Sequence, residues 1–153
     1  MSILFINTSS NHHGNTVSMA EELLQGQDYE TLHLNDYHIA QLGQTSPYDQ
    51  FEQVFDQIDQ ADTLVFGTPI YWHDMTGSLK LLIDRISEDV DWDSSHLAGK
   101  KVILLAQGAA PSATVLKHCD FIFQRFTSLA GMNYLGMASN PRDLSKMKKK
   151  AGF

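Results

Sequence analysis

The sequence predicts a three-layer α/β fold, in which helices cover both faces of a doubly wound, five-stranded parallel sheet with strand order 2-1-3-4-5. Short apolar runs, which suit parallel strands buried on both faces, alternate along the chain with amphipathic helical patterns. The length of 153 residues and the hydrophobic content of 42% suit one core. We therefore expect a single domain over residues 1–153.

Five runs predict the strands. Four are continuously apolar: Ile3–Ile6, Leu64–Phe66, Val102–Ala106 and, more weakly, Met132–Met137. A fifth run, Tyr29–Leu34, partly alternates between apolar and polar residues, so we expect it to lie near a sheet edge. In the predicted order the first and third strands are neighbours at the switch point of the sheet, which is where ligands bind in such folds.

Amphipathic patterns with the helical period lie between and after these strands. Their apolar stripes are Val17, Ala20, Leu23 and Leu24; Phe51, Val54, Phe55 and Ile58; Leu79, Leu82, Ile83 and Ile86; and Val115, Cys119, Ile122, Phe126 and Leu129. This alternation with the strands indicates right-handed crossovers. The last segment, Asp143–Lys150, predicts only about two helical turns, which would leave part of the sheet for a second subunit to cover.

Composition excludes several classes of function. The net charge of −7 argues against binding to a nucleic-acid backbone. A single cysteine, Cys119, allows no intramolecular disulfide and no thiolate metal site, and we expect no metal. No apolar run approaches the roughly 20 residues that span a bilayer, and we expect a cytoplasmic protein with no membrane partner. The segment Glu88–Ser95 predicts an acidic surface loop.

The segment Asn7–Thr16, which joins the first strand to the next helix, is rich in serine, threonine and asparagine. Such small side chains leave backbone N–H groups accessible, and a helix N-terminus adds partial positive charge. Gly14 permits close backbone approach, while Asn15 or Thr16 can cap the helix or donate to a phosphate. The segment indicates a phosphate site, with an ordinary helix entry as the alternative. It lacks the glycine pattern of dinucleotide and Walker loops.

An aromatic turn follows the third strand, where Tyr71, Trp72 and His73 come directly after Gly67-Thr-Pro-Ile. Taken alone, these aromatics are typical of side chains that pack a loop down. Their position beside a phosphate loop instead favours contact with a planar ligand. The fourth strand ends in Ala106–Ala110, whose small residues would let the backbone reach a ring edge. A phosphate at one end and a flat ring at the other describe flavin mononucleotide, FMN.

These residues resemble the small NAD(P)H-dependent FMN reductases of the flavodoxin-like superfamily. Ser9 with Gly14-Asn15-Thr16 matches the family's phosphate loop, S-x-x-x-x-G-N-T. The stretches Pro69-Ile70-Tyr71-Trp72, Gly77-Ser78-Leu79-Lys80 and Ile83-Asp84-Arg85 match its second motif, P-x-Y-W…G-x-L-K…D-R, and Leu97-Ala98-Gly99-Lys100 fits before the fourth strand. The resemblance covers about the first 110 residues.

The resemblance implies noncovalent FMN, with NAD(P)H as co-substrate and no catalytic side chain. Hydride would pass through the flavin to a small acceptor such as a quinone, an azo or nitro compound or free flavin. The implied cofactor-binding residues are Ser9, Ser10, Asn11, Gly14, Asn15 and Thr16 at the phosphate, Pro69, Ile70, Tyr71, Trp72 and His73 along the ring, and Gln107, Gly108 and Ala109 on its far side. A homodimer is also expected.

The chain departs from the family pattern at two places. Ser10-Asn11 stand where relatives often carry Pro-Arg, so the arginine that would meet the phosphate is missing. No cysteine lies between His38 and Gly43, where many relatives hold an iron–sulfur cluster, so a cluster is excluded.

Other interpretations remain open at this level. His73 would either hydrogen-bond the flavin or pair with Asp74, and the adjacent His12 and His13 suggest proximity to the phosphate or to solvent rather than a metal site. Arg85 we interpret as a subunit contact, against an ordinary surface ion pair. One competing function is a flavodoxin-like FMN electron carrier without nicotinamide activity. The other is a non-redox α/β module that binds a phosphoester.

Overall fold

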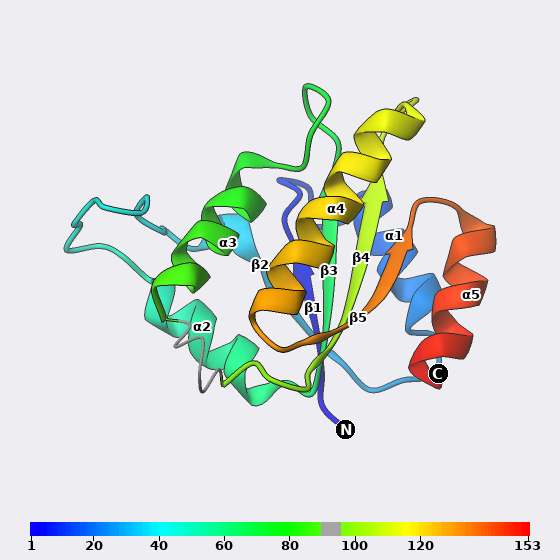
Figure 1. Cartoon of the computed structure of the whole chain (residues 1–153), viewed down its shortest axis with the longest axis horizontal. Helices are drawn as coiled ribbons and strands as arrows, with labels where there is room; N and C mark the ends of the chain where they lie inside the picture. Colours follow the sequence, from blue (N-terminus) through cyan, green and yellow to red (C-terminus); the bar gives the residue numbers. More distant parts are fainter. Residues whose placement is uncertain (90–95) are drawn as a thin grey trace.

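The computed structural model describes residues 1–89 and 96–153 and confirms the predicted fold class. A parallel sheet has the order β2-β1-β3-β4-β5 and lies between two layers of helices (Figure 1). The strands are β1 (Ile3–Asn7), β2 (Glu30–His33), β3 (Thr63–Pro69), β4 (Lys101–Gln107) and β5 (Asn133–Ala138). Most of the predicted acidic loop lies outside the described residues. Among the described helices, none is long and apolar enough to cross a membrane.

The helices divide into two layers according to the core that each contacts. These helices are α1 (Asn15–Leu23), α2 (Phe51–Gln60), α3 (Gly77–Asp89), α4 (Ala113–Leu129) and α5 (Pro141–Ala151), with a short 3-10 helix, η1, at Leu34–Asp36. Side chains from α2, α3 and α4 share one apolar cluster, whereas those from α1 and α5 share the other. The sheet therefore separates two apolar cores. Neither core covers the carboxyl edge of the sheet, which is the side where the parallel strands end and their loops begin.

Strand register aligns the ends of three neighbouring strands. Asn7, the last residue of β1, is paired with His33 of β2 on one side and with Gly67 of β3 on the other. All three strands are parallel, so the loops that follow them leave the sheet at the same edge. The predicted switch point between β1 and β3 is thus present in the structure.

The last helix is longer than the sequence analysis predicted. It spans the 11 residues of α5 rather than the two turns expected over Asp143–Lys150. The side chain of Asn140 caps its first turn, and Pro141 occupies a position where a proline starts a helix well. Leu144 and Met147 are buried against the sheet. The expectation that a short last helix leaves part of the sheet uncovered is therefore wrong, because α5 packs on this surface.

The two edge strands of the sheet are short or irregular. At one edge, β2 has four residues. At the other, the pairing of β5 with β4 changes register between Val102 and Ile103, and Gly136 adopts φ +127°. The ammonium group of Lys150 donates a hydrogen bond of 2.9 Å to the backbone carbonyl of Leu135 in this irregular strand.

Arg85 holds the segment between η1 and α2 within its own chain. Its guanidinium pairs with Asp49 at 2.8 Å, donates to the carbonyl of Ala40 at 2.8 Å and lies 4.4 Å from the ring centre of Phe51. Burial raises the pKa of Asp49, but hydrogen bonds from the Ala40 N–H and from Arg85 outweigh it and leave the pKa below its ordinary value. Arg85 therefore has an intrachain role, and its expected subunit contact stays a prediction.

Candidate functional site

Three loops meet at the carboxyl edge of the sheet and are joined by hydrogen bonds. Both the N–H and the hydroxyl of Thr8, just after β1, donate to the carbonyl of Gly67 in β3 at 2.9 Å. The N–H of Ile70, after β3, donates to the carbonyl of Gln107 at the end of β4, at 2.7 Å. The hydroxyl of Thr76 in turn donates to that of Thr8 at 2.8 Å. The predicted site segments thus form one connected rim.

In the first loop, side chains turn back onto the backbone. The oxygen of Ser9 accepts from the N–H of Asn11 at 3.1 Å, and the amide oxygen of Asn11 accepts from the N–H of His13 at 2.9 Å. Ser9 is buried, whereas Ser10 and Asn11 are exposed. Local bonds of this kind fix a tight loop conformation. The side chains predicted to grip a phosphate therefore also shape the loop that presents its backbone N–H groups.

The first turn of α1 offers free donors at the end of this loop. Gly14 is the capping residue, in an extended conformation, and no side chain caps the helix. Because the first N–H groups of a helix have no intrahelical partner, this turn has donors that can bind an anion. Asn15 is exposed, but Thr16 is buried, and its hydroxyl has no hydrogen-bond partner among the described residues. A buried hydroxyl without a partner is costly unless a ligand satisfies it.

The second loop is a strained hairpin turn. The N–H of Tyr71 donates to the carbonyl of Asp74 at 2.9 Å, and the reverse bond measures 3.2 Å. Between them Trp72 and His73 have φ angles of 48° and 64°, which cost about 1–2 kcal/mol per residue for side chains other than glycine. The turn lies beyond the end of β3 (Figure 1), and the Trp72 side chain is 95% exposed. The alternative in which Trp72 packs the loop down is therefore wrong.

The base of this hairpin rests on α4. Asp74 lies 3.4 Å from the imidazole of His118 and accepts a hydrogen bond from the Cys119 thiol at 3.7 Å. Burial, with the nearby charge of Asp74, raises the pKa of Cys119 to about 11, so this thiol stays protonated at neutral pH. The expected role of Cys119 as a core residue is confirmed. The carboxylate of Asp74 pairs with His118, and among the described residues it forms no ion pair with His73.

The third loop closes the rim with little side-chain bulk. Pro69 is buried and Ile70 half-buried, and Gln107 and Gly108 lie beside them at the end of β4, half-buried. A Cβ atom at Gly108 would lie 3.2 Å from Cβ of Ile70, so glycine allows these two loops to approach closely. Ala109 is exposed at the outer end of this loop. The backbone here can reach a ligand without obstruction by large side chains.

Comparison with known proteins identifies the family. Residues 1–136 match the family model described as NADPH-dependent FMN reductase. The Bacillus subtilis protein YwqN, whose name describes an NAD(P)H-dependent FMN-containing oxidoreductase, is 40% identical over 94% of this chain and 89% of its own length.

The chain belongs to the NADPH-dependent FMN reductase family.

Solved structures support the fold of this FMN reductase. The Trp repressor binding protein from Bacillus subtilis superposes with a TM-score of 0.71 and 29% identity, covering 98% of this chain and 95% of the other. A flavodoxin, WrbA-like protein from Agrobacterium tumefaciens gives a TM-score of 0.67 at 20% identity, covering 99% of this chain and 93% of the other, which shows the fold alone. The fold is therefore flavodoxin-like, as the sequence predicted.

The residues of this FMN reductase fit the cofactor that its family uses, FMN with NAD(P)H as hydride donor. The uncapped first turn of α1 and the partnerless hydroxyl of Thr16 suit a phosphate. The exposed aromatic hairpin lies on the same rim and suits a flat ring system. The described residues contain no cluster of histidine, cysteine and acidic groups that could hold a metal.

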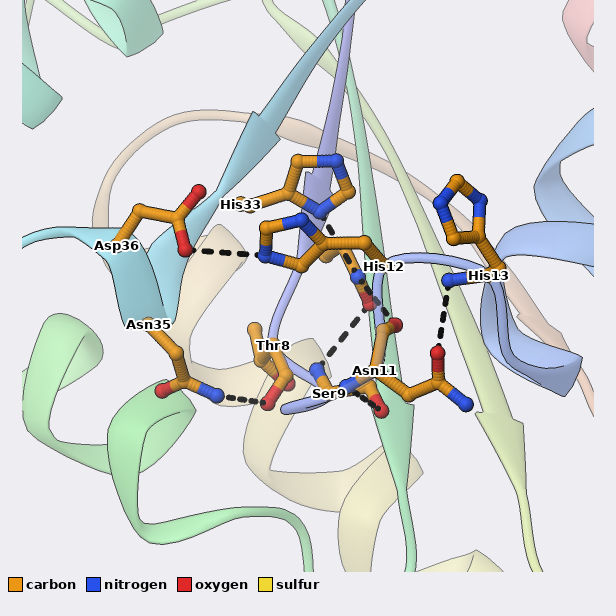
Figure 2. A network of polar contacts seen from close by, with 9 residues as sticks. Thr8, Ser9, Asn11, His12, His13, His33, Asn35 and Asp36 are labelled. Atoms are coloured by element: carbon orange, nitrogen blue, oxygen red, sulfur yellow. Dashed lines mark hydrogen bonds and ion pairs between the residues drawn. The ribbon is translucent and has the colours of Figure 1, made fainter.

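Sequence reasoning missed a group of polar residues beside the phosphate loop. In this FMN reductase His12 turns away from His13 and stacks on His33, with ring centres 3.9 Å apart, and its Nε2 lies 3.0 Å from a carboxylate oxygen of Asp36 (Figure 2). Asn7 lies behind them and is fully buried. These residues come from β1, its loop, β2 and η1, and only the register of β1 with β2 could have indicated their proximity.

Proposed function

We propose that this FMN reductase holds FMN noncovalently across the three loops and reduces a small acceptor with electrons from NAD(P)H. The observation that carries the proposal is the uncapped, anion-binding turn at Gly14–Thr16 on the same rim as the exposed hairpin at Tyr71–Asp74. When bound, the flavin ring accepts hydride from NAD(P)H and gives electrons to the acceptor. Quinones, azo compounds, nitroaromatics and free flavin are the acceptor classes that we propose.

The chain's residues would divide the work of binding along the rim. The phosphate would meet the backbone N–H groups of the loop and the hydroxyl of Thr16, in the segment comprising Ser9, Ser10, Asn11, Gly14, Asn15 and Thr16. The ring would lie along Pro69, Ile70, Tyr71, Trp72 and His73, and Gln107, Gly108 and Ala109 would border its far side. Backbone N–H groups of the rim would stabilise negative charge on the ring, so no side chain need act as acid or base.

The absorption spectrum of the purified protein tests this proposal. We expect an oxidised flavin spectrum that is bleached when NADH or NADPH is added without oxygen and restored when benzoquinone follows. Bleaching by dithionite but by neither nicotinamide would contradict the reductase and favour the electron carrier. A colourless protein that takes up no added FMN would contradict both and favour the phosphoester module. The family match favours the first outcome.

We also propose a homodimer formed through the face of α3 and α4. A groove of about 260 Å³ lies there, beside Phe121 and Leu129, which are 58% and 49% exposed. The groove carries Asp84 on α3 and Arg125 on α4, so a copy related by a two-fold axis can place opposite charges across the contact. Apolar side chains exposed together mark an association surface.

The mass of the protein in solution tests the homodimer. By light scattering after size exclusion, we expect the wild type to have twice the mass of the chain. Phe121→Glu is expected to produce monomer, since it buries a charge in the contact. Tyr48→Glu, at a side chain 77% exposed on the segment before α2, is the matched control and should remain dimeric. A monomeric wild type, or a dimer indifferent to Phe121→Glu, contradicts the proposed face.

A further inference from the structure

Asn7 occupies the junction between the sheet and the phosphate loop. It is fully buried at the end of β1. Its amide oxygen accepts from the N–H of Ser9 at 3.1 Å, and its amide nitrogen lies 3.1 Å from the carbonyl oxygen of Asn11. One side chain thus ties down two points of the loop that leads to α1. The orientation of this amide therefore contributes to the shape of the loop.

The third contact of Asn7 fixes the state of a histidine. Its amide nitrogen also lies 3.1 Å from Nδ1 of His33. One N–H of the amide points to the carbonyl of Asn11, and the other points to Nδ1 of His33. Nδ1 must therefore be the acceptor and carry no proton. The geometry requires neutral His33, with its proton on Nε2.

The surroundings of His33 favour this neutral form. Its ring stacks on His12 with an interplanar angle of 13°. Burial lowers the pKa of His33, the charges of His12 and His13 lower it further, and Asp36 opposes them without reversing the shift. These are the titratable groups that face His33 from the loop and from η1. The pKa of His33 is therefore below the ordinary histidine value, and the neutral form predominates at pH 7.

We propose that Asn7 and His33 are positioning residues for the cofactor phosphate, and that the phosphate loop is held in its binding shape only while His33 is neutral. This inference rests on the proposed FMN site. Protonated His33 carries an N–H at Nδ1, which would face the N–H of Asn7 and break the contact. The amide of Asn7 would then be free to turn, and its bonds to Ser9 and Asn11 would be lost together.

The pH dependence follows from the lowered pKa of His33. A histidine with a folded pKa below its unfolded value binds fewer protons in the folded, assembled loop. Its contribution is therefore fully present above pH 6.5 and is lost as pH falls through the folded value. A phosphate monoester also takes up a proton near pH 6, which weakens its binding in the same range. The experiment must separate these two effects.

Two substitutions of His33 separate protonation of this histidine from protonation of the phosphate. His33→Asn keeps an oxygen acceptor close to the position of Nδ1 and removes the titration, whereas His33→Leu removes the acceptor. The apoproteins are titrated with FMN and with riboflavin, which has the same ring without the phosphate, by quenching of flavin fluorescence between pH 7.5 and 5.5. Thermal unfolding of each variant is measured to test whether the variant is folded. The matched control is His96→Asn. His96 is an exposed histidine that precedes β4, at the amino ends of the strands and so opposite the phosphate loop.

At pH 7.5 we expect His33→Asn to bind FMN within about twofold of the wild type and His33→Leu roughly tenfold more weakly, the effect of one unsatisfied donor. Both variants should bind riboflavin with the same affinity as the wild type. Between pH 7.5 and 5.5, the FMN affinity of the wild type should fall about fivefold further than that of His33→Asn. In the variant only protonation of the phosphate itself weakens binding, because residue 33 no longer titrates. His96→Asn should follow the wild type throughout.

Asn7→Asp provides a second probe of the same contact. It keeps the size of the side chain but replaces both donors with an acceptor, so we expect FMN affinity to fall at least tenfold in a folded variant. Equal FMN affinity in the wild type, His33→Leu and Asn7→Asp would overturn the inference, as would parallel pH profiles for the wild type and His33→Asn. Failure of the wild type to bind FMN at any pH would instead contradict the proposed site.

Discussion

Gly67→Ala is expected to lower the free energy of unfolding by about 3 kcal/mol and to weaken FMN binding more than tenfold. A Cβ atom at Gly67 would lie 2.5 Å from Cγ2 of Thr16 and 2.7 Å from Cε2 of Phe5. These groups belong to the start of α1 and to β1, and α1 packs in the same apolar cluster as Phe5. The new methyl therefore has to displace the first turn of α1, which is where the phosphate is proposed to bind.

Chemical denaturation and fluorescence titration with FMN measure the two effects of Gly67→Ala. Gly77→Ala is the matched control, because a Cβ atom at Gly77 would meet no atom within 4 Å. This substitution should change the free energy of unfolding by less than about 0.5 kcal/mol. Adding Thr16→Ser removes the nearer of the two clashing groups, so it should recover part of the lost stability. Unchanged stability in Gly67→Ala would show that α1 and β3 are not packed as closely as described.

Replacement of Trp72-His73 by Asn-Gly should make the protein more stable and a poorer reductase. Both residues have positive φ angles, and Asn-Gly is the pair that such a two-residue turn favours. Because the Trp72 side chain is 95% exposed, its removal sacrifices little packing. We expect the free energy of unfolding to rise by about 1–2 kcal/mol, and NAD(P)H oxidation with a quinone to slow about tenfold as ring contacts are lost.

The two single substitutions divide the effect of the hairpin exchange. Trp72→Asn should account for most of the lost rate if the indole borders the flavin, and His73→Gly for most of the gained stability, since glycine tolerates positive φ best. Thermal unfolding and steady-state kinetics at saturating FMN supply the measurements. A variant that is both more stable and fully active would show that the strained aromatics have no role at the ring.

The sequence predicted the elements whose signals are local. The apolar runs of β1, β3 and β4 and the stripes on α1 to α4 are read from short windows. Their alternation indicates a parallel sheet, and a sheet of five such strands favours the observed order. The length of α5 was underestimated because its lysines obscure an apolar stripe at Leu144 and Met147. The pair Asn140-Pro141, an ordinary helix start, was the signal that could have corrected it.

The candidate site could be predicted only where its residues lie together in the chain. The phosphate loop and the aromatic turn are continuous segments, and the structure brings both to one rim. The partners of Arg85 and of Asn7 come from distant segments, so no window of sequence contains the contacts to Asp49 or His33. The exposure of Trp72 agrees with the expectation drawn from its position beside the phosphate loop, although taken alone an aromatic residue in a turn packs inward more often than it projects.

The irregular edges of the sheet bear on how this protein behaves at high concentration. An open sheet can template aggregation by adding a strand from another molecule, which needs a continuous row of free backbone groups. Here β2 is only four residues long, and at β5 the register shift and the Lys150 ammonium on the Leu135 carbonyl interrupt that row. The short β2 and the interrupted β5 thus disfavour fibril growth from the native fold, independently of its flavin chemistry.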